Sequence, residues 1–259
     1  MQVLAVDWSG DGRAAHRRIR VASAAPGRLL AVHGGLDRAA VADLLLARAA
    51  DGPLVAGLDF SFALPAWFPR EHGCADVDAL WSLVEREGEA WLRACRPPFW
   101  GRGPTPQPPL DPARPRYRAT EEAARADGFD PRSTFQIGGA GAVGTGSLRG
   151  MPHLARLRAH GVAVWPFDDA GPATLVEIYP RVHTGPVVKR SAEARRALAA
   201  GDPRVPAALV EDVVATEDAF DAALSALAMA EHLEELAALR RAPDGSPEAI
   251  EGALWRPVR

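Results

Sequence analysis

Short apolar runs separated by polar turns fill the first part of the chain and predict strands. Residues 2–8 form the first run, residues 17–24 the second and residues 29–33 the third. A turn cluster, Ser-Gly-Asp-Gly at residues 9–12, lies between the first run and the second. This spacing predicts an antiparallel meander of three strands.

Helical and strand patterns alternate through the rest of the chain. Residues 37–50 have apolar positions at helical spacing, and Asp37 is placed to cap this helix. Residues 54–59 then form a fourth strand, which we expect to be parallel to a neighbour because a helix precedes it. The later patterns predict helices at 77–94, 152–160 and 217–240, two short helices within 191–213, strands at 162–167 and 174–179, and a strand-like piece at 253–255. The whole pattern predicts an α/β fold.

Two segments of unusual composition interrupt this pattern. Residues 96–117 are rich in proline and predict a loop or lid that becomes ordered on demand, because long loops in compact domains are often functional. Residues 138–150 are rich in glycine, so their backbone amides can cradle a phosphate, with Arg149 as a candidate contact. A flexible connection fits the glycines equally. We expect one domain over residues 1–259, with the proline-rich loop as an insertion at about 96–135.

Composition narrows the class of protein. The chain has 259 residues, of which 47 % are hydrophobic and 24 % are charged, as in ordinary soluble globular proteins. We expect neither a membrane span nor a signal peptide, because no apolar run is long enough and the first strand begins at Gln2. Cys74 and Cys95 are too few for a disulfide framework or a cysteine zinc site, which predicts a reduced, cytoplasmic protein.

The distribution of basic residues limits how the chain can bind nucleic acid. The net charge is −3, so such binding needs a local basic patch. Lys189 is the only lysine, which excludes a Walker A loop and makes Lys189 a candidate substrate contact. Arg102 and Trp100, in the proline-rich segment, combine a cation with an aromatic ring and suit phosphate and base contacts. A solvated arginine-rich loop explains the same mixture.

Two of the predicted strands end alike, each on an aspartate, an aromatic residue and a serine. Asp7 closes the first strand and Asp59 closes the fourth. A carboxylate at the end of a buried strand is costly unless it is paired, hydrogen-bonded or bound to a cation. If the strands are neighbours, about 4.8 Å apart, the two aspartates can share a metal site. Alternatively, each aspartate caps the turn that follows it.

Three further acids join this pair. Glu177 lies in the middle of an apolar strand, and Asp218 and Asp221 lie three residues apart on one face of the last long helix. Mg²⁺ and Mn²⁺ prefer hard oxygen ligands. Two such ions roughly 3.5–4 Å apart can activate a water and stabilise the leaving oxygen of a phosphodiester. Structural explanations remain open: Asp218 complements the helix dipole, and Glu177 pairs with an arginine such as Arg181.

The order and spacing of these segments resemble one known family. The matching pieces, which span almost the whole chain, are Val6-Asp7-Trp8-Ser9, Gly57-Leu58-Asp59-Phe60-Ser61, Val176-Glu177-Ile178-Tyr179-Pro180, Glu217-Asp218-Ala219-Phe220-Asp221-Ala222 and Glu251-Gly252-Ala253-Leu254-Trp255-Arg256-Pro257. They resemble the domain of unknown function 429 family, regarded as predicted nucleases with an RNase H-like fold. That fold implies a mixed sheet, an antiparallel meander plus parallel strands, flanked by helices.

The resemblance implies a metal-dependent nuclease that acts on DNA or RNA with two Mg²⁺ or Mn²⁺ ions. Asp7, Asp59, Asp218 and Asp221 map to metal-binding positions. Glu177 is an additional acid, which either positions the water or completes the coordination.

Other interpretations stay open at the level of sequence. The actin and sugar-kinase group shares this core topology, so an ATP-dependent phosphotransferase or ATPase is one alternative, and a non-catalytic binding protein with the RNase H fold is another. His183 is a candidate general base, although a lone histidine is more often structural, and Glu251 is expected at the surface. The oligomeric state is open, a homodimer included.

Overall fold

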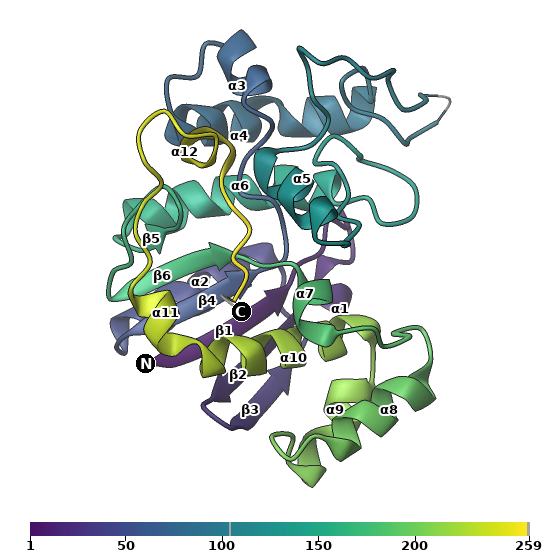
Figure 1. Cartoon of the computed structure of the whole chain (residues 1–259), viewed down its shortest axis with the longest axis vertical. Coiled ribbons are helices and arrows are strands. Elements are labelled where there is room, and N and C mark those ends of the chain that lie inside the picture. Colours follow the sequence, from purple (N-terminus) through teal and green to yellow (C-terminus); the bar gives the residue numbers. More distant parts are fainter. Residues whose placement is uncertain (104, 258–259) are drawn as a thin grey trace.

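A six-stranded mixed sheet forms the centre of the protein (Figure 1). The computed structural model describes residues 1–103 and 105–257. The strand order is β3-β2-β1-β4-β6-β5; β1, β2 and β3 pair antiparallel, and the others pair parallel. The strands are β1 (Gln2–Asp7), β2 (Arg20–Ala25), β3 (Arg28–His33), β4 (Leu54–Leu58), β5 (Ala163–Val164) and β6 (Ala173–Glu177). The predicted α/β class, the meander and the parallel fourth strand are confirmed.

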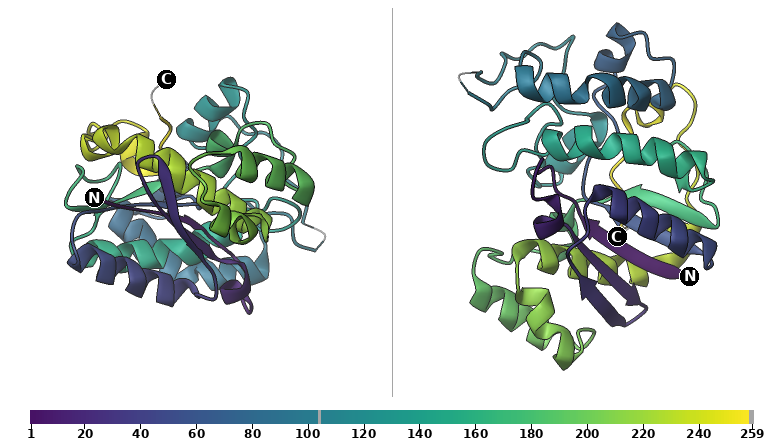
Figure 2. Two further views of the ribbon diagram at one scale, coloured as in Figure 1. Left: turned by 90° about the horizontal axis from the view of Figure 1, so that it is seen from below. Right: turned by 180° about the vertical axis from the view of Figure 1, so that it is seen from behind.

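Helices cover both faces of the sheet because the central strands are apolar on both sides. In β1, Leu4 and Val6 belong to one core, whereas Val3 and Ala5 belong to the other, as the two-residue period of a strand requires. The long helix α10 (Glu217–Glu231) packs across β1, β2 and β3 on one face. The other face carries α2 (Arg38–Ala50) and α6 (Gly144–Ala159), and α4 (Val77–Ala94) packs on α6 (Figure 2).

Side-chain caps fix the start of several helices. Asp37 accepts a hydrogen bond from the amide of Ala40, which confirms it as the N-cap of α2. Asp76 caps α4 in the same way, and Thr216 caps α10. The cap at Thr216 matters for the site described below, because it sets which residues form the first turn of α10.

The glycine-rich segment differs from its prediction. Helix α6 begins at Gly144, not at residue 152, and Pro152 lies inside it. Glycine disfavours helices, but here its lack of a side chain permits close packing. A Cβ at Gly144 would lie 2.2 Å from the carbonyl oxygen of Thr134, and one at Gly150 would lie 2.5 Å from the ring of Phe60. Tertiary packing therefore overrides local propensity.

Other boundaries also differ. The predicted helix at 217–240 is interrupted at His232, after which α11 (Leu233–Ala237) follows. The predicted strand at 162–167 is reduced to β5, because Pro166 has no amide hydrogen for the ladder. The two helices expected within 191–213 are α8 (Ala192–Gly201) and α9 (Val210–Val214), and a 3₁₀ turn at Ala207–Leu209 joins them. The strand-like piece predicted at 253–255 forms a single β-bridge, between Leu254 and Glu177.

Five short helices are absent from the predicted pattern. They are α1 (Ala15–Arg18), α3 (Trp67–Glu71), α5 (Ala119–Ala126), α7 (Pro180–Thr184) and α12 (Glu248–Glu251). Helix α5 lies within the insertion predicted as a loop at 96–135, and Pro104 of that insertion lies outside the described residues. Among the helices that the structure describes, we find none with the length and apolar character that crossing a membrane requires.

The close approach at Gly150 leads to a testable result. Gly150→Ala is expected to lower the free energy of unfolding by about 1–3 kcal/mol, because the new methyl group overlaps the buried ring of Phe60. Gly88→Ala in α4 is the matched control: its Cβ would be 3.4 Å from the nearest atom, so it should stabilise by about 0.5–1 kcal/mol through helix propensity. Urea unfolding compares the two, and equal shifts would contradict the packing argument.

Candidate functional site

Two aspartates lie side by side at the carboxyl edge of the sheet. Asp7 is the last residue of β1, and Asp59 directly follows β4. These strands are parallel neighbours in which Val6 is aligned with Leu58, and the amide of Asp59 donates to the carbonyl of Val6 at 3.0 Å. The crossover through α2 therefore returns the chain with the second aspartate beside the first. Neither carboxylate accepts a hydrogen bond from a described residue.

Helix α10 supplies two further carboxylates. Asp218 is in its first turn and is half-buried, and Asp221 is one turn on and buried. Both raise the pKa of Asp7, and both also raise the pKa of Asp59. The four aspartates therefore share one electrostatic environment although they come from three distant segments of the chain.

Burial and mutual repulsion disfavour the charged form of this cluster. Burial, followed by the charge of Asp59, raises the pKa of Asp7 well above its ordinary value. Burial, followed by the charge of Asp221, raises the pKa of Asp59 to about 8. The pKa values of Asp218 and Asp221 are also raised, mainly by burial. Without a cation, the cluster therefore holds protons at neutral pH that an exposed aspartate would release.

Lys189 brings a positive charge into the cluster. Its ammonium group forms an ion pair with Oδ2 of Asp221 and lowers the pKa of Asp7 and Asp59. The other carboxylate oxygen of Asp221, Oδ1, is buried and has no partner among the described residues. Arg20 and Arg18 act on Asp218 only through their charge. The cations around the cluster thus leave carboxylate oxygens available to a ligand.

Glu177 is adjacent to the cluster, but protein groups occupy its oxygens. It ends β6, aligned with Leu58, and its charge raises the pKa of Asp59. Both its oxygens bind the buried guanidinium of Arg118, at 2.5 and 2.9 Å, and Oε2 also accepts the amide of Phe62. The predicted arginine partner thus exists, although it is Arg118 and not Arg181.

The network around Arg118 was not predicted from the sequence. Arg118 also binds the carboxylate of Glu121 and donates to the carbonyl oxygen of Glu251. Glu251 is buried and accepts the amides of Ala66 and Ala119, so its expected surface position is wrong. Only Arg118 and Glu121, three residues apart, carry a local signal, because the other partners are distant in sequence.

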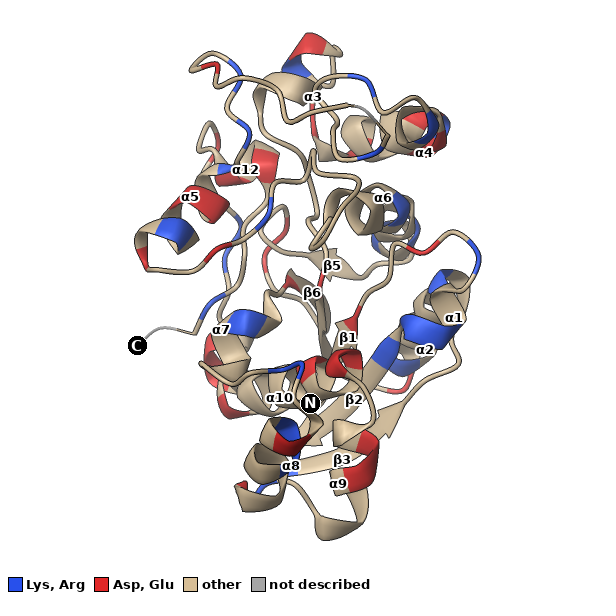
Figure 3. Cartoon of the chain, turned by 90° about the vertical axis from the view of Figure 1, so that its right-hand side faces the viewer, with Lys and Arg blue, Asp and Glu red and all other residues tan. Residues whose placement is uncertain are grey.

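A cleft of about 1030 Å³ opens beside Asp59. The loop at 141–143, in the glycine-rich segment, lines one side of it, and the segment after β6 lines another. Phe129 and Tyr179 meet edge to face there, with Arg132 and Arg181 nearby in the lining. Figure 3 shows positive and negative residues interspersed over this side of the molecule. A polyanion would therefore meet both signs of charge on this side of the molecule.

The other predicted substrate contacts are engaged elsewhere. Arg149 forms an ion pair with Glu89 and donates to the carbonyl oxygen of Gly10. Arg102 donates to two backbone carbonyls and to Thr145. Trp100 is buried and lines a different pocket. None of these three side chains lines the cleft beside Asp59.

His183 does not act on the aspartates in the free protein. It stacks on Trp255, and burial lowers its pKa to about 4. Its Nε2 atom has no hydrogen-bond partner among the described residues. A neutral imidazole against an aromatic ring is a packing arrangement, which agrees with the structural explanation.

The described carboxylates do not form a ready-made metal site, and the chain has no match among known proteins. Within residues 1–103 and 105–257, no group of three or more Asp, Glu, His or Cys side chains is already arranged to hold a metal ion. No family model, curated protein or solved structure matches the chain. The function must therefore be argued from the chemistry of the site itself.

Proposed function

We propose that this protein is a divalent-cation-dependent hydrolase of phosphodiester bonds in nucleic acid, built on an RNase H-like fold. The observation that carries the proposal is that Asp7 and Asp59 end neighbouring parallel strands, with Asp218 and Asp221 within electrostatic reach on α10, which packs on β1. Such a cluster is unfavourable in an isolated protein and becomes favourable when cations enter it. The order of elements, with a meander, a parallel strand and a late acidic helix, supports the fold assignment.

The donor set fits Mg²⁺ or Mn²⁺. All four groups are carboxylates, which are hard oxygen ligands. Among the described residues, none donates a hydrogen bond to the carboxylate of Asp7 or Asp59, and Oδ1 of Asp221 is buried without a partner. Because these oxygens are not gathered in advance, we expect the side chains to reorient when the ion binds.

The proposed hydrolysis assigns different roles to these residues. Bound divalent ions would activate a water and stabilise the leaving oxygen. Asp7 and Asp59 hold the site from the rigid edge of the sheet, while Asp218 and Asp221 close it from α10. Lys189 holds Asp221 through its ion pair and would supply a positive charge beside the bound phosphate. Glu177 fixes the amide of Phe62 and thereby the loop that follows Asp59.

The kinase-like alternative has less support. It needs an open glycine-rich loop for the phosphates, whereas Gly144, Gly146 and Gly150 belong to α6, and only residues 138–143 of the segment form a loop. A Cβ at Gly10, in the turn after β1, would lie 2.5 Å from the amide nitrogen of Gly146. That close contact leaves no room for a phosphate between the turn and the helix.

Titration of Mn²⁺ by calorimetry tests the proposal. We expect saturable binding that Asp7→Asn and Asp221→Asn each weaken at least tenfold, because one carboxylate is lost from a shared site. Asp51→Asn is the control. Asp51 is exposed at the end of α2, before the amino end of β4, whereas the aspartates lie at the opposite, carboxyl edge of the sheet. A panel of DNA and RNA substrates with Mn²⁺ then tests hydrolysis. Binding that is indifferent to both substitutions would reject the proposal.

A further inference from the structure

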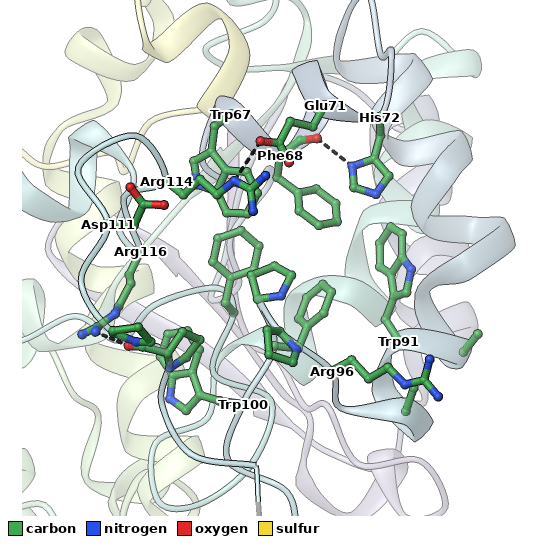
Figure 4. A pocket seen from close by; sticks show the side chains of 18 residues that line it. Trp67, Phe68, Glu71, His72, Trp91, Arg96, Trp100, Asp111, Arg114 and Arg116 are labelled. Atoms are coloured by element: carbon green, nitrogen blue, oxygen red, sulfur yellow. Dashed lines mark hydrogen bonds and ion pairs between the residues drawn. The ribbon is translucent and has the colours of Figure 1, made fainter.

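A second cavity, of about 570 Å³, lies between α3, the end of α4 and the proline-rich segment (Figure 4). It shares no lining residue with the cleft beside Asp59. Its volume falls in the range of small-molecule sites, roughly 300–1,000 Å³. The proposed hydrolysis makes no use of it, so its chemistry needs a separate explanation.

Aromatic rings form the walls of this cavity. Phe68 meets Trp91, Phe99 and Trp67 at centroid distances of 5.3, 5.8 and 5.7 Å, edge to face in each case. Trp67 and Trp91 are only half-buried, so part of each ring is open to the cavity. Phe99 stacks on one face of Trp91, and Arg114 lies over the ring of Trp67, so a planar ligand ring would stack on the ring surface that these contacts leave uncovered.

The charged residues around the cavity leave an excess of positive charge. Arg114 is neutralised by Glu71 at 2.9 Å and lies over the ring of Trp67. Arg96 is exposed at the mouth and has no partner among the described residues. Nε of Arg116 is buried and also lacks one there, although Arg116 donates to the carbonyl oxygen of Pro108. Asp111 already caps its own turn at Ala113.

We infer that this aromatic pocket binds a nucleotide, with its base against Trp67 and Trp91 and its phosphate at Arg96. Partly uncovered aromatic rings beside a guanidinium without a partner among the described residues favour a ligand that is both aromatic and anionic. The choice of a nucleotide within that class rests on the proposed function. The ligand is either a free nucleotide or an unstacked nucleotide of a single strand, and both present the same chemistry.

Binding without divalent ions tests the inference apart from hydrolysis. Adenosine 5′-monophosphate is titrated in EDTA, with tryptophan fluorescence and calorimetry as readouts. We expect saturable binding, and roughly tenfold weaker binding of both adenosine and ribose 5-phosphate, because each lacks one of the two recognised groups. A short single-stranded oligonucleotide distinguishes the two sources: competition with the monophosphate indicates a strand, and no competition indicates a free nucleotide.

Two variants assign the binding to this pocket. Arg96→Gln is expected to weaken the binding of the monophosphate roughly tenfold and to leave the binding of adenosine unchanged. Trp91→Leu is expected to weaken the binding of both ligands. Arg93→Gln is the matched control, since Arg93 is exposed on α4 and does not line the pocket. Arg96 is exposed, so its variant should fold, and circular dichroism verifies this for Trp91→Leu.

The outcomes separate this inference from the proposed function. Monophosphate binding that both variants leave unchanged, or no saturable binding in EDTA, would overturn the aromatic pocket as a nucleotide site even if hydrolysis is found. Conversely, absence of hydrolysis together with binding that depends on Arg96 and Trp91 would reject the proposed function and leave the pocket in place.

Discussion

Asp59→Asn is expected to stabilise the cation-free protein at pH 8 by up to about 5 kcal/mol, while reducing phosphodiester hydrolysis at least about 100-fold. The gain follows from the pKa of about 8 that burial and repulsion impose on this carboxyl in the folded state. In the unfolded chain the same group titrates near 3.9. Asparagine has nearly the same shape but no charge to bury.

The sign of the pH dependence follows from proton counting. Between about pH 4 and pH 8 the folded protein holds a proton on Asp59 that the unfolded chain has released. The free energy of unfolding of the unsubstituted protein therefore falls as pH rises through this window. The charges of Asp221, Glu177 and Asp218 raise the pKa of Asp59 further, and the charge of Lys189 lowers it.

Urea unfolding in EDTA from pH 5 to pH 9 measures this difference. The stability advantage of Asp59→Asn should grow with pH, and Asp51→Asn should show no such trend, because Asp51 is exposed. With added Mn²⁺, the unsubstituted protein should become more stable than Asp59→Asn, because binding of the ion stabilises it. A variant that is less stable at pH 8 in EDTA would mean that Asp59 carries a structural contact, which would contradict a functional acid cluster.

The positions of the two strand aspartates could be predicted from the sequence because they depend on short segments of the chain. The apolar run fixes β1 and β4, and the crossover rule makes them parallel neighbours, so Asp7 and Asp59 meet. The position of Asp218 and Asp221 on one helix face also follows from sequence spacing. That this face turns toward the sheet edge depends on the packing of α10 across β1 and β2, for which the apolar stripe of α10 gave a signal.

Interactions between distant segments were not predictable in the same way. Trp100 and Arg102 have the composition of a nucleic-acid contact, yet packing turns Trp100 inward and assigns Arg102 to carbonyl groups of residues 92 and 137. The glycines of α6 predicted a loop from the sequence. The atoms that pack against them belong to residues 60 and 134, which the local pattern does not reveal. Composition alone cannot tell a flexible glycine from a closely packed one.

The second large effect is expected at Arg118. Arg118→Met should lower the free energy of unfolding by about 3–5 kcal/mol, because it leaves the buried carboxylates of Glu177 and Glu121 without their cation. Burial already raises the pKa of Glu121 in the presence of the arginine. Arg125→Met is the control: its ion pairs with Glu122 and Asp130 are exposed, so it should cost less than about 1 kcal/mol.

A double-mutant cycle shows whether the loss arises from the pair itself. Adding Glu177→Gln to Arg118→Met should recover part of the stability, because the amide removes the unpaired charge. Urea unfolding of the four proteins gives the coupling. Strictly additive effects would mean that Arg118 acts through Glu121, through packing or through the carbonyl of Glu251, and not through Glu177.

The same cycle decides the role of Glu177 in the site. If its carboxylate serves only to hold Arg118 and the amide of Phe62, Mn²⁺ affinity should be nearly unchanged in Glu177→Gln, while stability falls. If Glu177 is instead a cation ligand, Arg118→Met should free its oxygens and strengthen Mn²⁺ binding. Because both oxygens are bound to a guanidinium that is itself buried, we expect the first result: Glu177 positions the loop after Asp59, and the aspartates alone receive the cation.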